Sequence, residues 1–278
     1  MFILQAMRYI YLLTLSAFIA ACQPSGQQRQ PAVADTDSLA VAISNIRADL
    51  QVKPGDPELR VYLANALTAH GEYAAADSVA ALLAADTASA FQADYVRAYV
   101  ALQQRDSTAA IRHLSAAIKA KGAASEYEAV MLNADMLLHR RAAKEALPFY
   151  QLAYTIDSSS AEALYGAGRC HELLRNAAKA AAQYQSAIRT DPAYSPAYIA
   201  LGRQEEKSGR ENAALHYYNL AAKASPTDAD AFYQRGRILL RRGNRPAGLD
   251  DLSKALSFRK DFPEAKALLD SARANNFQ

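Results

Sequence analysis

The chain has 278 residues, of which 51% are hydrophobic, and its formal net charge is +3. This charge is too small to indicate a general affinity for nucleic acid or for a membrane surface. With 11 glycines, 10 prolines and two cysteines, the chain fits neither a fold of many short strands nor a disulfide scaffold. Much of the hydrophobic content is alanine, the strongest helix former, so the composition predicts an all-α protein.

The N-terminal segment, residues 1–21, predicts a secretion signal. Arg8 precedes an apolar run from Tyr9 to Ile19. The run is shorter than the ~20 residues that span a bilayer, and it fits the apolar core of a signal peptide. A membrane anchor or a buried helix is the alternative interpretation.

The signal ends in the sequence Ile19-Ala20-Ala21-Cys22, which resembles the bacterial lipobox. This resemblance implies that residues 1–21 are removed and that Cys22 becomes a lipidated N-terminus, held on a membrane by acyl chains. Gln23 follows the cysteine, where an aspartate retains such lipoproteins in the inner membrane, so the resemblance implies the outer membrane.

Residues 22–35 are polar and contain almost no large apolar side chain, so we expect a flexible tether. Some lipoproteins carry an acidic cluster after the cysteine that directs them to the cell surface. The tether has no such cluster, so the lipoprotein resemblance implies the periplasmic face of the membrane. The next segment has Leu39, Ile43, Ile46 and Leu50 on one helical face, and it predicts a single helix from Thr36 to about Gln51.

Self-similarity with a period of about 34 residues organises the rest of the chain. Six repeats are expected near residues 57–90, 91–126, 127–160, 161–194, 195–228 and 229–262, and the second has two extra residues within Lys121–Glu126. Small residues fill column 8 of the repeats: Ala64, Ala98, Ala134, Gly168, Gly202 and Gly236. They also fill column 20: Ala76, Ala110, Ala146, Ala180, Ala214 and Gly248. Column 24 is large in five repeats: Leu114, Tyr150, Tyr184, Tyr218 and Leu252.

This column pattern resembles the tetratricopeptide repeat, in which two helices, A and B, approach closely at the small residues. The resemblance implies an all-α, right-handed superhelical solenoid of helix pairs. Its ends are expected to be covered by a half-repeat at 36–56 and a capping helix at 263–275. An unrelated alanine-rich bundle is the alternative, but a bundle would not repeat glycine, alanine and tyrosine at fixed columns across three copies. Leucine at Ala180 or Ala214 is expected to overpack a helix contact, whereas Ala222 is expected to lie away from it.

No stretch of the sequence predicts an active site, a metal site or a cofactor site. The five histidines have no metal-ligand spacing: His70, His113, His139, His171 and His216. Cys170 is expected to pack in the core, and Glu205 and Glu206 are expected to form a solvated helix face rather than a catalytic pair. We therefore expect a protein that is not an enzyme.

The resemblance also implies a concave groove lined by the A-helices. In the C-terminal half, column 9 of this groove holds Arg169, Arg203 and Arg237, and tyrosines stand at column 5. Both residue types are favoured at interfaces. The candidate partner-binding residues are Arg169, Arg203, Arg237, Arg241, Tyr165 and Tyr233.

Two of the three column-9 arginines have a glutamate at i+3 that could neutralise them. Arg169 precedes Glu172, and Arg203 precedes Glu206. Arg237 has no such neighbour, so it is expected to be the most available for a partner. The expected ligand is an acidic or C-terminal segment of a protein.

The features together predict an outer-membrane lipoprotein on the periplasmic face. It is expected to act as an interaction scaffold or assembly factor for an envelope complex, with a protein or peptide partner and no nucleic acid. A tether to the cell wall and a non-catalytic subunit of an envelope enzyme are the alternatives.

Overall fold

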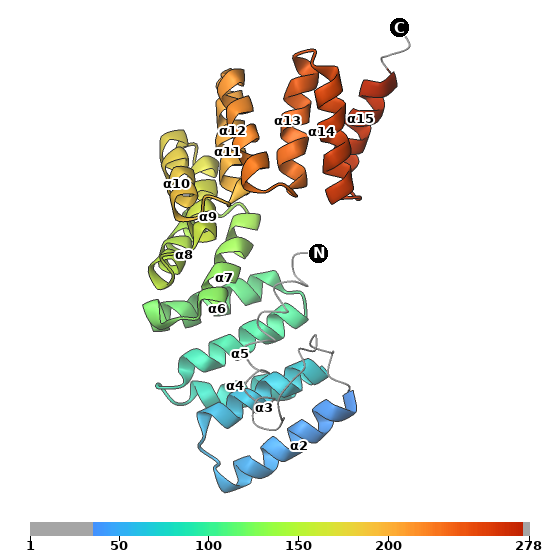
Figure 1. The fold of residues 1–278 in the computed structure, drawn as a ribbon. Coiled ribbons are helices and arrows are strands. Elements are labelled where there is room, and N and C mark those ends of the chain that lie inside the picture. The colour runs from blue at the N-terminus through green and yellow to red at the C-terminus, as the bar shows by residue number, and fades with distance from the viewer. Residues whose placement is uncertain (1–35, 275–278) are drawn as a thin grey trace, which may run out of the picture. The chain divides into compact units, whose positions relative to one another are not determined.

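The structure is a computed structural model that describes residues 36–274. The predicted signal peptide, the lipidated Cys22 and the tether lie outside the described residues. Residues 36–274 form fourteen α-helices and one short 3₁₀ helix, and they contain no strand (Figure 1). The helices pack as sequential pairs in a tetratricopeptide-like solenoid, which confirms the predicted fold class.

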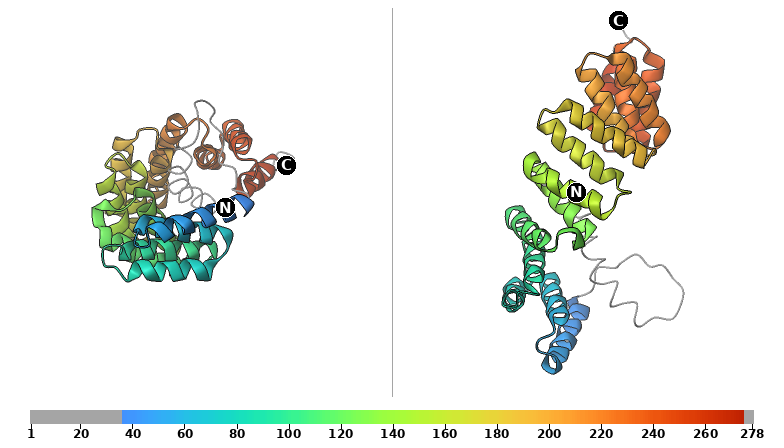
Figure 2. Two further views of the ribbon diagram at one scale, coloured as in Figure 1. Left: turned by 90° about the horizontal axis from the view of Figure 1, so that it is seen from below. Right: turned by 90° about the vertical axis from the view of Figure 1, so that its left-hand side faces the viewer.

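The described helices belong to two compact units, which meet in sequence between Arg140 and Arg141. Unit 1 contains α2 (Thr36–Val52), α3 (Pro57–His70), α4 (Tyr73–Ala84), α5 (Ala90–Gln103), α6 (Ser107–Lys121), η1 (Gly122–Ala124) and α7 (Tyr127–His139). Unit 2 contains α8 (Ala143–Ile156), α9 (Ala161–Leu173), α10 (Ala177–Thr190), α11 (Ser195–Lys207), α12 (Glu211–Ala224), α13 (Ala229–Arg241), α14 (Arg245–Phe258) and α15 (Pro263–Ala274). Within each unit every α-helix packs against the next one along the chain, as Figure 2 also shows.

Short-range capping explains where several A-helices begin. The Asp56 side chain accepts hydrogen bonds from the backbone N–H groups of Glu58 and Leu59, so it caps α3. Ser160 caps α9 in the same way through the N–H of Ala163. The A-helices begin at Pro57, Ala90, Tyr127, Ala161, Ser195 and Ala229, within one residue of the starts expected from the period. The two extra residues of the second repeat were expected within Lys121–Glu126, and η1 lies in this segment.

Two of the three column-8 glycines, Gly168 and Gly202, each lie against a tyrosine ring. Tyr184 and Tyr218 are fully buried. A methyl group added to Gly168 would lie 2.4 Å from Cε1 of Tyr184, and one added to Gly202 would lie 2.4 Å from Cε1 of Tyr218. Both contacts join helices A and B of a single repeat, so the small column and the large column are two sides of one contact.

The small residues of column 20 are buried as expected, with Ala180 1% and Ala214 0% exposed. Ala222 was expected to lie away from this contact and therefore to tolerate leucine better, but it is buried as well. Ala222 is 7% exposed and belongs to the same hydrophobic cluster as Ala214 and Tyr218. This cluster also contains Ala229, Ala231 and Phe232 of α13, the A-helix that packs on α12. Ala182, which is exposed on α10, is the proper comparison for an overpacking substitution.

The turn between helices A and B requires a left-handed residue at column 15 of every repeat. Gly71, Gly209 and Gly243 supply it with φ between 74° and 90°. In the other three repeats the position is an arginine with φ of 57° to 61°: Arg105, Arg141 and Arg175. Glycine therefore predicts a left-handed turn residue in only three repeats. In the other three, the arginine itself does not predict one.

Replacing Arg175 with glycine is expected to stabilise unit 2. A left-handed conformation costs a non-glycine residue about 1–2 kcal/mol, and the greater flexibility of unfolded glycine offsets about half of that gain. The expected increase in the free energy of unfolding is therefore about 0.5–1 kcal/mol, measured by urea denaturation. Gly209→Ala, at the same column, should change the stability in the opposite direction. Stabilisation by both substitutions would contradict this explanation of the turn.

The terminal helices each bury one face. In α2 the buried side chains are Leu39, Ile43 and Ile46, and in α15 they are Ala265, Leu269 and Ala272. The remaining faces of both helices are largely exposed to solvent. Among the helices of residues 36–274, none has the length and the apolar character needed to cross a bilayer.

Candidate functional site

The candidate site is the A-helix face of unit 2. We define this face by seven charged side chains on α9, α11 and α13, at columns 9, 12 and 13 of their repeats. They are Arg169, Glu172, Arg203, Glu206, Lys207, Arg237 and Arg241. Five are basic and two are acidic, so the face has a surplus of three positive charges.

Glu206 on α11 is the most highly bonded member of this face. Its Oε2 accepts from Nη2 of Arg237 at 2.5 Å, and its Oε1 accepts from Nη2 of Arg241 at 2.9 Å. The hydroxyl of Tyr218 on α12 also donates to Oε2, at 3.1 Å. The Glu206 side chain is only 17% exposed. The expectation that Glu206 lies on a solvated face is therefore wrong.

Arg237 was expected to be the most available arginine because it has no acidic i+3 or i+4 neighbour, and this expectation is wrong. Its carboxylate partner lies 31 residues earlier, on the preceding A-helix, and so it escapes a search of the i+3 and i+4 neighbours. Arg241 forms a second ion pair, because its Nε lies 3.2 Å from Oε2 of Glu211. The two arginines join α13 to the helix pair before it.

The same arrangement occurs one repeat earlier. Oε1 of Glu172 on α9 accepts from Nζ of Lys207 on α11 at 2.5 Å, and its Oε2 accepts from the Tyr184 hydroxyl at 3.1 Å. In both repeats a column-12 glutamate is held by the buried column-24 tyrosine of its own repeat and by the column-13 cation of the next. The motif ends at the sixth repeat, where columns 12 and 24 are Leu240 and Leu252.

Neither of the two i+3 ion pairs considered from the sequence forms, because both glutamates are held by the following repeat. Arg169 instead donates from Nη1 to the Tyr165 hydroxyl at 3.2 Å, and its guanidinium lies 5.8 Å from the centre of that ring. Arg203 is exposed, and it forms no hydrogen bond or ion pair with any side chain or backbone group of residues 36–274. Arg203, not Arg237, is thus the available arginine.

The two candidate tyrosines are half-buried in aromatic contacts. The Tyr165 ring lies 5.6 Å from the rings of both Tyr184 and Tyr194, and the Tyr233 ring lies 4.9 Å from that of Phe262. These contacts fix the rings within the array and leave only part of each for a partner.

The electrostatics of the face follow from burial and pairing. Burial alone raises the pKa of Glu206, but the hydrogen bond from Arg241 and the charge of Arg237 outweigh it and hold that pKa below its usual value. Glu172 behaves likewise, because Lys207 outweighs burial and lowers its pKa. Burial raises the pKa of Tyr218, as does the Glu206 carboxylate, while the charges of Arg237 and Arg203 oppose this rise. At neutral pH both glutamates are therefore ionised and the tyrosine is neutral.

Other polar groups are engaged in local structure. His113 pairs with Asp94 at 2.8 Å, His70 pairs with Glu72 at 3.0 Å, and Cys170 is buried, as expected. Within residues 36–274, no three histidine, cysteine, aspartate or glutamate side chains are grouped so that they could hold a metal ion.

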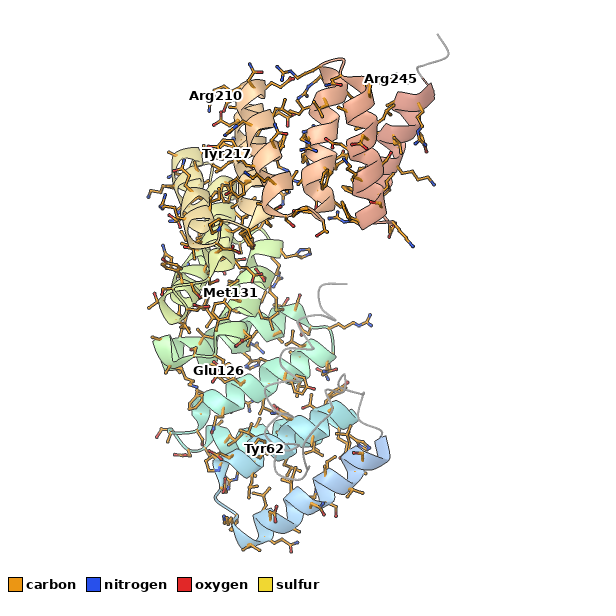
Figure 3. All side chains as sticks on the ribbon, in the orientation of Figure 1. Tyr62, Glu126, Met131, Arg210, Tyr217 and Arg245 are labelled. Atoms are coloured by element: carbon orange, nitrogen blue, oxygen red, sulfur yellow. The ribbon has the colours of Figure 1, made fainter. Side chains whose placement is uncertain are left out.

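Glu205 differs from its neighbour Glu206 because it pairs with Arg210, at the turn after α11. Figure 3 labels Arg210 together with Arg245, at the start of α14. Both lie at the end of unit 2 where each A-helix turns into its B-helix.

Comparison with known proteins supports the fold. A family model described as tetratricopeptide repeat matches residues 95–161 and 157–195. No curated protein matches the sequence. A solved tetratricopeptide repeat protein from Thermus thermophilus is 16% identical, with a TM-score of 0.50, and the match covers 66% of this chain and 99% of that one.

Two further solved structures are similar at low identity. The Cut9–Hcn1 hetero-tetramer of APC/C matches over 86% of this chain and 46% of that one, with 13% identity and a TM-score of 0.51. A crystal structure of MamA matches over 61% of this chain and 96% of that one, with 22% identity and a TM-score of 0.49. At such identities a likeness concerns the fold alone.

Proposed function

We propose that the chain is a protein–protein interaction scaffold that binds an acidic partner segment on the A-helix face of unit 2, because residues 95–195 match a tetratricopeptide repeat model and the described helices pack as sequential pairs. The observation that supports this proposal best is the exposed Arg203, which has no partner among residues 36–274 and stands beside paired arginines. A guanidinium offers a planar fork that matches a carboxylate, so an unpaired one on a basic face favours an acidic ligand.

The geometry of the face suits an extended segment. Arg169, Arg203 and Arg237 occupy the same column on α9, α11 and α13. Packed helices are about 8–10 Å apart, so these columns cover roughly 20 Å. An extended peptide of about six residues has that length. Arg203 lies at the middle of this path, where a buried contact contributes most to binding.

We also propose that the scaffold is anchored by lipid to the outer membrane, on the periplasmic face, and that it assembles or recruits an envelope complex. The support for this location is the Ile19–Cys22 sequence together with Gln23. A lipid anchor would hold the A-helix face near the membrane, where it could recruit a partner at high local concentration.

Replacing Cys22 with serine is expected to remove the protein from the membrane fraction. Serine offers no thiol for the acyl-glycerol group, so the variant should appear as a soluble or unprocessed protein. The measurement is immunoblotting of outer-membrane, inner-membrane and soluble fractions after a salt wash. If the serine variant still fractionates with the outer membrane, lipidation is not what anchors the chain.

The scaffold proposal is tested by affinity capture from solubilised membranes, before and after digestion of the cell wall. We expect a protein partner in both preparations and its loss with Arg203→Ala. Arg189→Ala is the matched control, because Arg189 is an exposed arginine on α10, outside the A-helix face. Capture that depends on undigested cell wall and ignores Arg203 would instead indicate a cell-wall tether.

A further inference from the structure

Glu206 occupies the place that a partner carboxylate would take on α13. Its two oxygens accept from both candidate arginines of that helix, Arg237 and Arg241, at 2.5 and 2.9 Å. The Tyr218 hydroxyl holds the carboxylate from the side of α12. A side chain of the protein thus makes the contacts that an acidic ligand would be expected to make.

The cluster nevertheless keeps unused capacity for an anion. Nε of Arg237 is buried and has no hydrogen-bond partner among residues 36–274. Arg203 is also unpaired in this part of the chain, and the positive charges of Arg203 and Arg237 both act to lower the pKa of Tyr218. The acidic groups around these arginines are Glu206 and, at the outer side of Arg241, Glu211.

Glu172 provides an internal comparison because it has the same tyrosine contact and the same column. Its cation is Lys207, at 2.5 Å, and the column-9 arginine of its own repeat, Arg169, donates to Tyr165 instead. Removing the charge of Glu172 would therefore release a lysine but no arginine of column 9. The two glutamates differ mainly in which cations they neutralise.

We propose that Glu206 is an internal competitor that sets how acidic a segment must be to bind the A-helix face of unit 2. A ligand with one carboxylate can engage only Arg203. A ligand with several neighbouring carboxylates can also displace Glu206 from Arg237 and Arg241. Glu206 thereby weakens the binding of every acidic segment, but it weakens multiply acidic segments least and so selects for them. This inference rests on the proposed function of the face.

The test compares Glu206→Gln with Glu172→Gln in the mature chain. Each substitution removes one negative charge from the same face, and glutamine keeps the shape and can still accept a hydrogen bond from the tyrosine. The probe is a fluorescein-labelled hexa-aspartate peptide, and the measurement is its Kd by fluorescence anisotropy. Glu206→Gln is expected to tighten binding about tenfold, because it releases two arginines. Glu172→Gln should change the Kd no more than about threefold.

A second probe tests the selectivity. A peptide with a single aspartate among alanines should gain more from Glu206→Gln than hexa-aspartate does, because only the multiply acidic peptide can displace Glu206 from the wild-type face. Thermal unfolding establishes that each variant is folded. If Glu206→Gln is unfolded, Glu206→Met is used in its place, because methionine fills a similar volume without charge. It is also expected to tighten peptide binding.

The outcomes separate this inference from the proposed function. Equal tightening by Glu206→Gln and Glu172→Gln would show a general effect of net charge and would overturn the inference alone. Weaker binding by Glu206→Gln would show that the glutamate positions the arginines for the ligand, which also overturns it. Failure of the wild-type chain and every variant to bind either peptide would overturn the proposed function itself.

Discussion

Replacing Asp251 with alanine is expected to destabilise unit 2 by about 3 kcal/mol. Asp251 lies on α14 with its side chain 3% exposed, and both of its oxygens accept from Arg235 on α13 at 2.7 Å. Loss of this carboxylate leaves a largely buried guanidinium without its counter-charge, which typically costs about 3–5 kcal/mol. We take the lower figure because the Arg235 side chain is still 22% exposed.

The adjacent residue provides a matched control. Asp250 pairs with Lys254 at 2.6 Å, but these side chains are 60% and 48% exposed. Asp250→Ala should change the free energy of unfolding by no more than about 0.5 kcal/mol, because exposed pairs contribute little. Urea denaturation of both variants checks the difference. Similar losses at the two positions would contradict the view that burial makes the Arg235–Asp251 pair important.

Replacing Gly202 with alanine is expected to destabilise the protein by about 1–3 kcal/mol, although the same change in an open helix stabilises by about 1 kcal/mol. The sign is reversed because the new methyl group would lie 2.4 Å from Cε1 of Tyr218, and this ring is fully buried. Neither the ring nor the backbone of α11 can move without disturbing the next contact.

The second repeat indicates how this loss can be rescued. There the corresponding columns hold Ala98 and Leu114, which are 0% and 2% exposed. In a Tyr218→Leu background, Gly202→Ala should therefore cost less than about 0.5 kcal/mol. The measurement is a double-mutant cycle by urea denaturation. A stabilising effect of Gly202→Ala in the wild-type background would show that the glycine is not there to admit the ring.

The fold was predictable because its determinants repeat within the sequence. Gly168 and Gly202 stand in one column and their partners Tyr184 and Tyr218 in another, so a local packing rule appears as a periodic pattern. The left-handed turn was predictable only where glycine marks it. Arg175 carries no such mark, since arginine has no preference for positive φ, and only its column, shared with Gly209 and Gly243, could have shown it.

The pairing of the site was not predictable from neighbours within one helix. The choice between Arg203 and Arg237 as the available arginine depends on how α11 and α13 approach each other, which the superhelical packing decides. One signal was present in the sequence. Glu172 and Lys207 are separated by 35 residues, and so are Glu206 and Arg241. A search for opposite charges 35 residues apart, one residue more than the repeat, would have found both pairs.

Arg203 is the residue on which the proposed binding of acidic segments by the A-helix face of unit 2 depends most. The decisive experiment is the Kd of fluorescein-labelled hexa-aspartate for the wild-type chain, Arg203→Ala and the control Arg189→Ala, at low and at physiological salt. We expect binding by the wild type that weakens with salt, a loss of about 2 kcal/mol with Arg203→Ala, and no change with Arg189→Ala. Equal affinity of the wild type and Arg203→Ala, or equal weakening in both variants, would contradict the proposal.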